Sequence, residues 1–411
     1  MFGFLSSGLF LGWSLGANDA SNVFGTAVAS RMIKFKTAAL YCSIFVIIGA
    51  VVSGAGASHT LGKLGAVNAL AGAFIVAFAA AMSVYLMTIA RFPVSTSQAI
   101  VGAIIGWNMF SGSITDMGAL TKIVSTWIFC PLLAAMFSMV FYLLTAFTVK
   151  YCSIPIFRLD SLTRLSLLCA GIFGSYSLGA NNIANVMGVF VPVFDIAPIS
   201  LLGISFSAAQ QLFLLGGIAI AVGVFTFSKR VMLTVGKGIF DLSPVMAAVV
   251  VWSHSIVLFL FSSVSLETWL KSHGLPSFPL VPVSSSQAIV GAVIGIGLLK
   301  GGKTIRWKTV VGITSGWVTT PVIACIISFI SLFFLQNVFQ QNTYQQVQYR
   351  LDQPAVIALE KKNVPTKALQ SLVGKTYSNA VAFKKAVQTV AHLKENQLSL
   401  VIEATKNTNG Q

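Results

Sequence analysis

The chain has 411 residues, of which 56% are hydrophobic and only 9% are charged. A soluble globular domain carries roughly 25% charged residues, so this composition excludes an ordinary soluble domain. The formal net charge is +16, but the basic residues are scattered through polar segments without an aromatic-interleaved basic face. The charge therefore does not indicate nucleic-acid binding.

The apolar residues gather into long runs rather than into stripes. A helix needs about 20 apolar residues to cross a bilayer. The runs that reach this length are 37–57, 66–90, 123–149, 199–227, 245–264 and 310–335. We therefore expect an all-α, multi-pass integral membrane protein. Residues 1–15 lack a basic n-region and a suitable cleavage site, which favours the start of a membrane helix over a signal peptide.

A polar motif follows at residues 16–22, which read Gly-Ala-Asn-Asp-Ala-Ser-Asn. At membrane depth, irregular backbone is tolerated only where it lines a cavity or is buried in protein. We expect a broken helix here, with oxygen atoms that face a site. Asp19 is the sharpest candidate, because an intramembrane carboxylate typically binds an ion or carries a proton. The alternative is a helix cap or an interfacial residue.

A second motif occupies residues 93–103, which read Pro-Val-Ser-Thr-Ser-Gln-Ala-Ile-Val-Gly-Ala. Proline and small hydroxyl residues favour a helix start, and the apolar residues that follow continue the helix. A helix N-terminus at membrane depth offers free N–H groups and about half a positive charge, which suit an anion such as phosphate or carboxylate. Ordinary capping is the alternative, but it accounts for one hydroxyl of the three.

Both motifs recur in the same order, at residues 179–185 and 282–292. Trp127 with Pro131 likewise recurs as Trp317 with Pro321. We therefore divide the chain into a first transmembrane repeat at 1–150, a second at 151–335 and a soluble C-terminal tail at 336–411. The motif starts lie further apart in the second half than in the first, so we expect an insertion around 265–280. The tail is expected to be partly helical or disordered.

Four clusters of Lys and Arg separate the apolar runs. Cytoplasmic loops are enriched in Lys and Arg, and the four clusters share one side only if each half crosses the membrane five times. An odd number of crossings makes the halves inverted. We thus expect two inverted-topology repeats with broken helices and helical hairpins, about ten spanning segments in all, a design that recurs in secondary transporters.

The paired Gly-Ala-Asn motifs and the paired Pro-Val-Ser segments resemble the inorganic phosphate transporter (PiT) family over residues 1–335, with the tail outside the resemblance. Residues 234–239 and 295–300 also look like that family. The resemblance implies symport of inorganic phosphate with H⁺ or Na⁺ by alternating access, with no cofactor and no enzymatic activity. It implies a phosphate site at Ser95, Thr96, Ser97, Ser284, Ser285, Ser286, Asn22 and Asn185. It implies cation coupling at Asn18, Asp19, Asn181 and Asn182, with Asp19 as a metal ligand if the cation is Na⁺.

This chain departs from the family pattern at three positions. Asn182 stands where the second motif usually has Asp, and Gln98 and Gln287 stand where the hairpins commonly have His. A glutamine can donate a hydrogen bond but cannot titrate near neutral pH. The coupling ion and its stoichiometry are therefore left open, as is oligomeric state, where a homo-oligomer is one option. In a bacterium, the location would be the inner (plasma) membrane.

Three alternatives to phosphate symport remain. The first is transport of sulfate or another tetrahedral oxyanion, because the site is rich in hydroxyls and holds no basic residue. The second is an uncoupled anion channel that uses the same helix ends. The third is a membrane enzyme, which is the weakest because no nucleophile–base set or catalytic carboxylate pair stands out. His254, inside an apolar run, could relay protons, although a histidine satisfied within the core is the more ordinary outcome.

Overall fold

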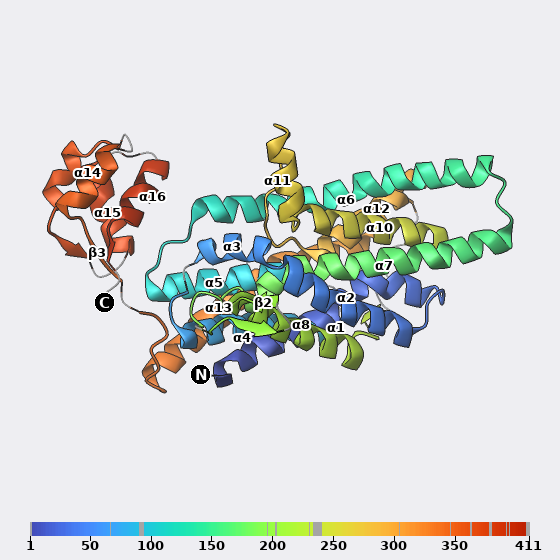
Figure 1. Ribbon diagram of the computed structural model, residues 1–411, viewed down its shortest axis with the longest axis horizontal. Helices are drawn as coiled ribbons and strands as arrows, with labels where there is room; N and C mark the ends of the chain where they lie inside the picture. Colours follow the sequence, from blue (N-terminus) through green and yellow to red (C-terminus); the bar gives the residue numbers. More distant parts are fainter. Residues whose placement is uncertain are drawn as a thin grey trace.

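The computed structural model describes residues 2–65, 67–89, 94–194, 196–201, 204–229, 231–232, 241–303, 305–345, 347–361, 364–377, 380–391, 393 and 395–407. The family-like stretch 234–239 and Pro93 lie outside the described residues. Figure 1 shows a bundle of long helices with a smaller C-terminal unit beside it.

The elements of the first half are all helices: η1 (Phe2–Leu5), α1 (Ser6–Ala29), α2 (Phe35–Ser53), α3 (Ala55–Leu64), α4 (Leu70–Ile89), α5 (Thr96–Ser111) and α6 (Met117–Tyr151). Those of the second half are α7 (Ile156–Met187), β1 (Ile199–Leu201), β2 (Ile204–Phe206), α8 (Ala208–Thr226), α10 (Pro244–Leu260), α11 (Val264–Ser272), α12 (Ser285–Leu299) and α13 (Trp307–Asn337). The short helix α11 lies in the segment where we expected an insertion, and it meets α10 at a bend of 69°.

The helices that carry the Asn motifs are continuous, so our expectation of a broken helix at these motifs was wrong. The polar side chains of α1 and α7 are buried against other helices, and the backbone therefore keeps its own hydrogen bonds. The motif glycines allow close packing instead of a break. A Cβ on Gly16 would collide with the carbonyl of Ile220, and a Cβ on Gly179 would collide with that of Val46.

Each half packs against the other through matching pairs of helices. α1 packs on α8 while α7 packs on α2, and α5 packs on α13 while α12 packs on α6. The repeated prolines explain part of this exchange. Gly102 of α5 lies against the carbonyl of Pro321, and Gly291 of α12 lies against the carbonyl of Pro131. The repeated Trp and Pro residues of α6 and α13 therefore mark the place where each of these helices packs against the hairpin helix of the other half.

The apolar run 199–227 is helical only in its second part. Residues 199–206 form the antiparallel pair β1–β2, and α8 begins after Ser207. The physical reason is a capping box, in which the Ser207 hydroxyl accepts the Gln210 N–H while the Gln210 side chain accepts the Ser207 N–H. This reciprocal cap defines where the helix starts.

The outward faces of the long helices are apolar. Leu132, Leu143 and Phe147 of α6 and Val318 and Phe333 of α13 are all more than half exposed. By length and composition, α2, α4, α6, α8 and α13 can each cross a membrane, and α10 with α11 can count as a sixth, bent span. This places the described bundle in a lipid bilayer, because such a surface suits hydrocarbon rather than water.

The region after α13 folds around a core of its own. Its elements are β3 (Gln348–Arg350), α14 (Gln353–Lys361), η2 (Lys367–Leu372), β4 (Thr376–Tyr377), α15 (Ala380–Val390), α16 (Glu395–Ala404) and β5 (Lys406–Asn407). The strands form one antiparallel sheet in the order β4-β3-β5. Leu351, Leu369, Phe383 and Val401 are buried in this second core. The described part of the tail is thus an ordered α/β unit rather than an irregular appendage.

Candidate functional site

The two hairpin helices begin in the same way. The hydroxyl of Ser95 accepts the N–H of Gln98 at 3.2 Å, and the hydroxyl of Ser284 accepts the N–H of Gln287 at 3.2 Å. These two serines are therefore the N-caps of α5 and α12. Because the first N–H groups of a helix have no intrahelical partner, those of residues 96–97 and 285–286 remain directed out of the helix start.

The two helix starts meet inside the bundle. The hydroxyl of Ser97, in the first turn of α5, donates to the carbonyl of Val283 at 3.0 Å. Val283 directly precedes the N-cap of α12. Both α5 and α12 extend from this meeting point, and Figure 1 shows them running toward opposite ends of the bundle. Two helix N-termini, one from each half, are thereby brought to one place.

The Asn motifs contact these helix starts across the two halves. Asn22 of α1 donates to the hydroxyl of Ser285 at 3.1 Å. In the reverse direction, Asn185 of α7 donates to the hydroxyl of Ser97 at 2.9 Å. The last Asn of each motif therefore holds a hydroxyl from the other half's hairpin.

The fourth position of the motif behaves differently in the two halves. Asp19 accepts a hydrogen bond from the Thr96 hydroxyl at 3.3 Å, within its own half. Asn182 accepts from Asn185 at 3.0 Å and lies 3.5 Å from the Ser97 hydroxyl. Asp19 contacts the hairpin of its own half, the first. Asn182 belongs to the second half, but it also contacts the hairpin of the first half.

Three other predicted site residues contact the segments that surround the helix starts. Asn18 donates to Thr88 of α4 at 2.9 Å. Asn181 holds the loop before α12, because it accepts the Val283 N–H at 3.0 Å. The Ser286 hydroxyl lies 3.1 Å from that of Ser284. These side chains are buried next to the site, and their contacts shape it.

The site carries a single fixed charge. Among the described residues, Asp19 is the only Asp, Glu, Lys or Arg that is buried. Several buried polar atoms of the Asn motifs and the hairpins have no hydrogen-bond partner within the described part of the chain: Asp19 Oδ1, Asn22 Oδ1, Asn182 Nδ2, Asn185 Oδ1, Gln98 Oε1 and Gln287 Oε1. Buried polar atoms are normally paired. The oxygens can bind a cation, and the N–H groups, hydroxyls and helix ends can bind an anion.

The structure also places His254 and Thr88 at the site. Nε2 of His254, on α10, lies 2.9 Å from the Ser285 hydroxyl. In the sequence, His254 stood out only as a polar residue inside an apolar run. Thr88 had no signal at all, because nothing in the sequence indicates that it faces the first Asn motif.

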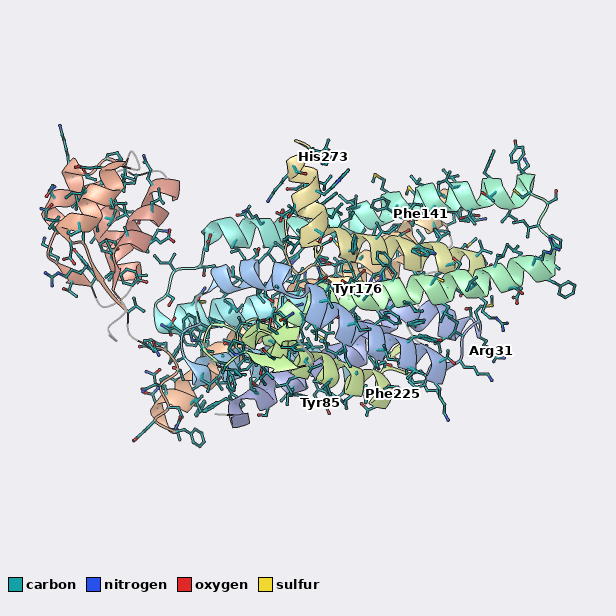
Figure 2. The ribbon with its side chains drawn as sticks, viewed as in Figure 1. Arg31, Tyr85, Phe141, Tyr176, Phe225 and His273 are labelled. Carbon is teal, nitrogen blue, oxygen red and sulfur yellow. The ribbon has the colours of Figure 1, made fainter. Side chains whose placement is uncertain are left out.

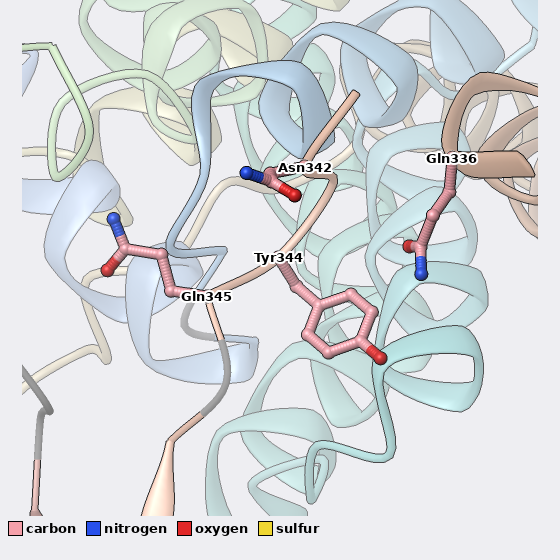
Figure 3. Close-up of a pocket in the computed structure, with 4 residues that line it drawn as sticks. All are labelled: Gln336, Asn342, Tyr344 and Gln345. Carbon is pink, nitrogen blue, oxygen red and sulfur yellow. The ribbon is translucent and has the colours of Figure 1, made fainter. Parts of the chain in front are cut away.

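A polar pocket lies elsewhere, where α13 runs into the C-terminal region (Figure 3). It has a volume of about 270 Å³ and is lined by Gln336, Asn342, Tyr344 and Gln345. Tyr344 packs against Phe110 at the far end of α5, about 20 Å along that helix from its start at Thr96. This pocket is therefore separate from the meeting point of the hairpins.

Comparison with known proteins adds the family. The model of the phosphate transporter family matches residues 15–158, 156–268 and 277–405. The chain belongs to this phosphate transporter family. The resemblance noted from the duplicated motifs is thus confirmed, and the matched region of this family member extends beyond residue 335, where we had expected the likeness to stop.

Relatives of this transporter family member differ in the anion that their names carry. A phosphate permease of Methanocaldococcus jannaschii is 29% identical over 78% of this chain and 93% of its own length. The sulfate permease CysP of Bacillus subtilis is 30% identical over 79% of this chain and 86% of its own length. A solved structure, the sodium-dependent phosphate transporter, is 22% identical, has a TM-score of 0.63 and covers 81% of this chain and 98% of its own. That structural likeness supports the fold alone.

Proposed function

We propose that this protein is a secondary transporter of inorganic phosphate, coupled to H⁺ or Na⁺ and working by alternating access. The observation that carries the proposal is the meeting of two helix starts, one from each half, among the Asn side chains of both motifs. Hydroxyls and N–H groups converge there from α5 and α12, and Asn22 and Asn185 hold them in place. Family membership supports phosphate as the anion.

The anion would be held by neutral donors. No Lys or Arg is among the buried residues that the structure describes, so the positive potential comes from the two helix N-termini. Two of the predicted phosphate-binding hydroxyls, those of Ser95 and Ser284, already cap their helices, and the other four remain available. We assign direct contact to Thr96, Ser97, Ser285 and Ser286, with the caps fixing the helix starts.

The cation would bind beside Asp19. Asp19 Oδ1 is a buried carboxylate oxygen without a hydrogen-bond partner in the described residues, and the Asn motifs and hairpins hold further unpartnered amide oxygens. A cation at this carboxylate offsets the charge of phosphate inside the membrane, where an uncompensated charge is costly. Loading of both ions would then precede exposure of the site to the opposite side.

We propose that an inverted topology of the two halves underlies the alternating exposure. Lys229 lies 5.9 Å from the ring of Phe35, which stands between Lys34 and Lys36, so two of the basic clusters lie close to each other. Figure 2 shows Arg31 at one end of the bundle. We propose ten spanning segments, namely the six apolar spans together with the motif helices α1 and α7 and the hairpin helices α5 and α12.

Sulfate is the second candidate substrate. It is tetrahedral like phosphate, the proposed site uses neutral donors, and a relative at 30% identity is a sulfate permease. Asn182 in place of a carboxylate reduces the negative charge near the anion. This change would ease the binding of an anion that keeps two negative charges at neutral pH.

Uptake into proteoliposomes tests both proposals. We would measure labelled phosphate uptake with an imposed H⁺ gradient, with an imposed Na⁺ gradient and with neither, and add excess sulfate as a competitor. We expect uptake that requires one of the gradients and is only weakly inhibited by sulfate. Uptake that ignores both gradients would indicate an uncoupled channel, and strong competition by sulfate would favour the sulfate proposal.

A further inference from the structure

The strongest unassigned feature is His254, which lies fully buried on α10 and points at the site. Its neighbours Ser253 and Ser255 bond to their own helix, at Val249 and Val251. His254 does not. Its Nε2 lies 2.9 Å from the hydroxyl of Ser285 in the first turn of α12, and its Nδ1 has no partner among the described residues.

The direction in which the Ser285 hydroxyl donates its hydrogen bond depends on the protonation of His254. A hydroxyl offers one hydrogen and two lone pairs. Asn22 already donates to the Ser285 oxygen at 3.1 Å. In the neutral tautomer that carries its proton on Nδ1, Nε2 of His254 accepts a hydrogen bond from the Ser285 hydroxyl. When a further proton binds at Nε2, the Nε2–H donates to the second lone pair of Ser285, and the hydroxyl hydrogen of Ser285 can donate to another group.

We propose that His254 is a positioning residue that couples a proton to anion binding by turning Ser285 into a donor. This inference rests on the proposed function, because the anion is the phosphate of that site. A buried imidazolium without a counter-charge is costly, and an anion at the α5 and α12 starts supplies one. Proton and anion therefore bind together: the proton enters with the anion from one side and leaves with it on the other.

The first half shows the corresponding arrangement with the opposite charge. Thr96 matches Ser285 in the repeated motif, and its hydroxyl donates to Asp19. The equivalent hydroxyls of the two hairpins thus each contact a buried titratable side chain, a carboxylate in one half and an imidazole in the other. The second motif has lost its carboxylate at Asn182, and His254 brings a titratable group to that half.

The surroundings of α10 leave few other groups that could titrate in this place. Of the helices packed against it, α1 brings only Asp19 and α12 brings no titratable side chain. α6 brings buried Cys130, whose thiol faces the Ser284 carbonyl at 3.7 Å. The remaining titratable side chains of α6 and α7 are exposed or half-buried: Lys122, Tyr142, Lys150, Tyr151, Arg158, Asp160, Arg164, Cys169 and Tyr176.

The test compares the pH dependence of transport in matched variants. His254→Gln keeps an amide donor but cannot titrate, and Ser285→Ala removes the hydroxyl on which His254 acts. Two controls match them. Ser253→Ala changes the neighbouring buried serine, and His273→Gln removes an exposed histidine directly after α11, labelled in Figure 2.

The quantity to measure is the ratio of the KM for phosphate at about pH 8 to that at about pH 5.5, the interval in which histidine ordinarily changes charge. Phosphate itself titrates in this interval, but equally for every variant. We expect the ratio in the wild type, S253A and H273Q to exceed that in H254Q and S285A by at least about fivefold. If H254Q does not fold, S285A carries the comparison.

A wild-type ratio in H254Q or S285A would overturn the inference while leaving phosphate transport in place. Absence of phosphate uptake by the wild type under any gradient would instead refute the proposed function. Calorimetry on the purified protein gives an independent reading, since binding in two buffers of different ionisation enthalpy counts the protons taken up with phosphate. The wild type should take up more protons per phosphate than H254Q, and equal counts would contradict the coupling.

Discussion

Asp19 and Asn182 stand at the same position of a duplicated motif, yet their side chains differ in charge and in hydrogen-bond partner. Asp19 carries the only buried fixed charge of the described residues and bonds to Thr96. Asn182 is neutral and accepts from Asn185. A neutral amide can orient its neighbours but cannot balance a cation. We therefore place cation binding on the first half and treat Asn182 as part of the anion side.

Replacement of the carboxylate tests this assignment. Asp19→Asn preserves size and hydrogen bonding but removes the charge, so we expect gradient-driven phosphate uptake to fall by at least about tenfold, in keeping with the functional weight of an intramembrane carboxylate. Asp160→Asn is the matched control, because Asp160 is exposed and pairs with Arg164. Unimpaired uptake by D19N in proteoliposomes would sink the role of Asp19.

At the scale of elements, glycine decides how closely the hairpin helices approach their partners. Gly102 and Gly291 occupy equivalent places in the two hairpin motifs, and each lies against the carbonyl of a proline inside the partner helix. A Cβ at either position would meet backbone atoms, which cannot move aside like the end of a flexible side chain. This packing holds the starts of α5 and α12 at the site.

Adding one methyl group at these glycines should separate the helices. We expect Gly102→Ala and Gly291→Ala each to destabilise the protein by about 1–3 kcal/mol, the usual range for overpacking, and to lower its Tm in detergent. Gly62→Ala is the control, since a Cβ at Gly62 meets nothing within 4 Å. A Tm of G102A or G291A equal to that of G62A would contradict the close-packing account.

For the whole molecule, we propose an inverted repeat, and the reciprocal packing of the two halves supports a repeat of matching helices. α10 begins near the end of the bundle where Asp241 pairs with Arg306 at 3.1 Å. Its 17 residues cover about 25 Å, so α11 lies toward the other end. Ser243 caps this helix at its start.

Labelling from each side of the membrane tests the orientation. We expect Lys303→Cys to react with an impermeant thiol reagent only from the cytoplasmic side, because the basic clusters favour that side. Ser272→Cys on α11 should react only from the opposite side. Both variants need a background in which the exposed Cys152 and Cys169 are replaced by Ser. Reaction of both positions from the same side would exclude the inverted arrangement.

The sequence by itself determined the class of the molecule and the residues that gather at the site. Runs of apolar residues and scarce charge are intrinsic to each segment, so they indicate membrane helices without knowledge of the fold. Duplication is equally local, and it identified the Asn motifs and the hairpin starts. The sequence also predicted a break at the Asn motifs, which was wrong because these side chains are buried between helices while the backbone of α1 and α7 stays helical.

Helix packing, in contrast, determines which half of the molecule each side chain contacts. The contacts of Asn22 with Ser285 and of Asn185 with Ser97 join residues far apart in the chain, and no local pattern encodes such a distance. The same holds for His254, whose sequence context is that of any core histidine. The role that we propose for His254 depends on the Ser285 hydroxyl that it faces. Which groups face each other is a property of helix packing rather than of sequence order.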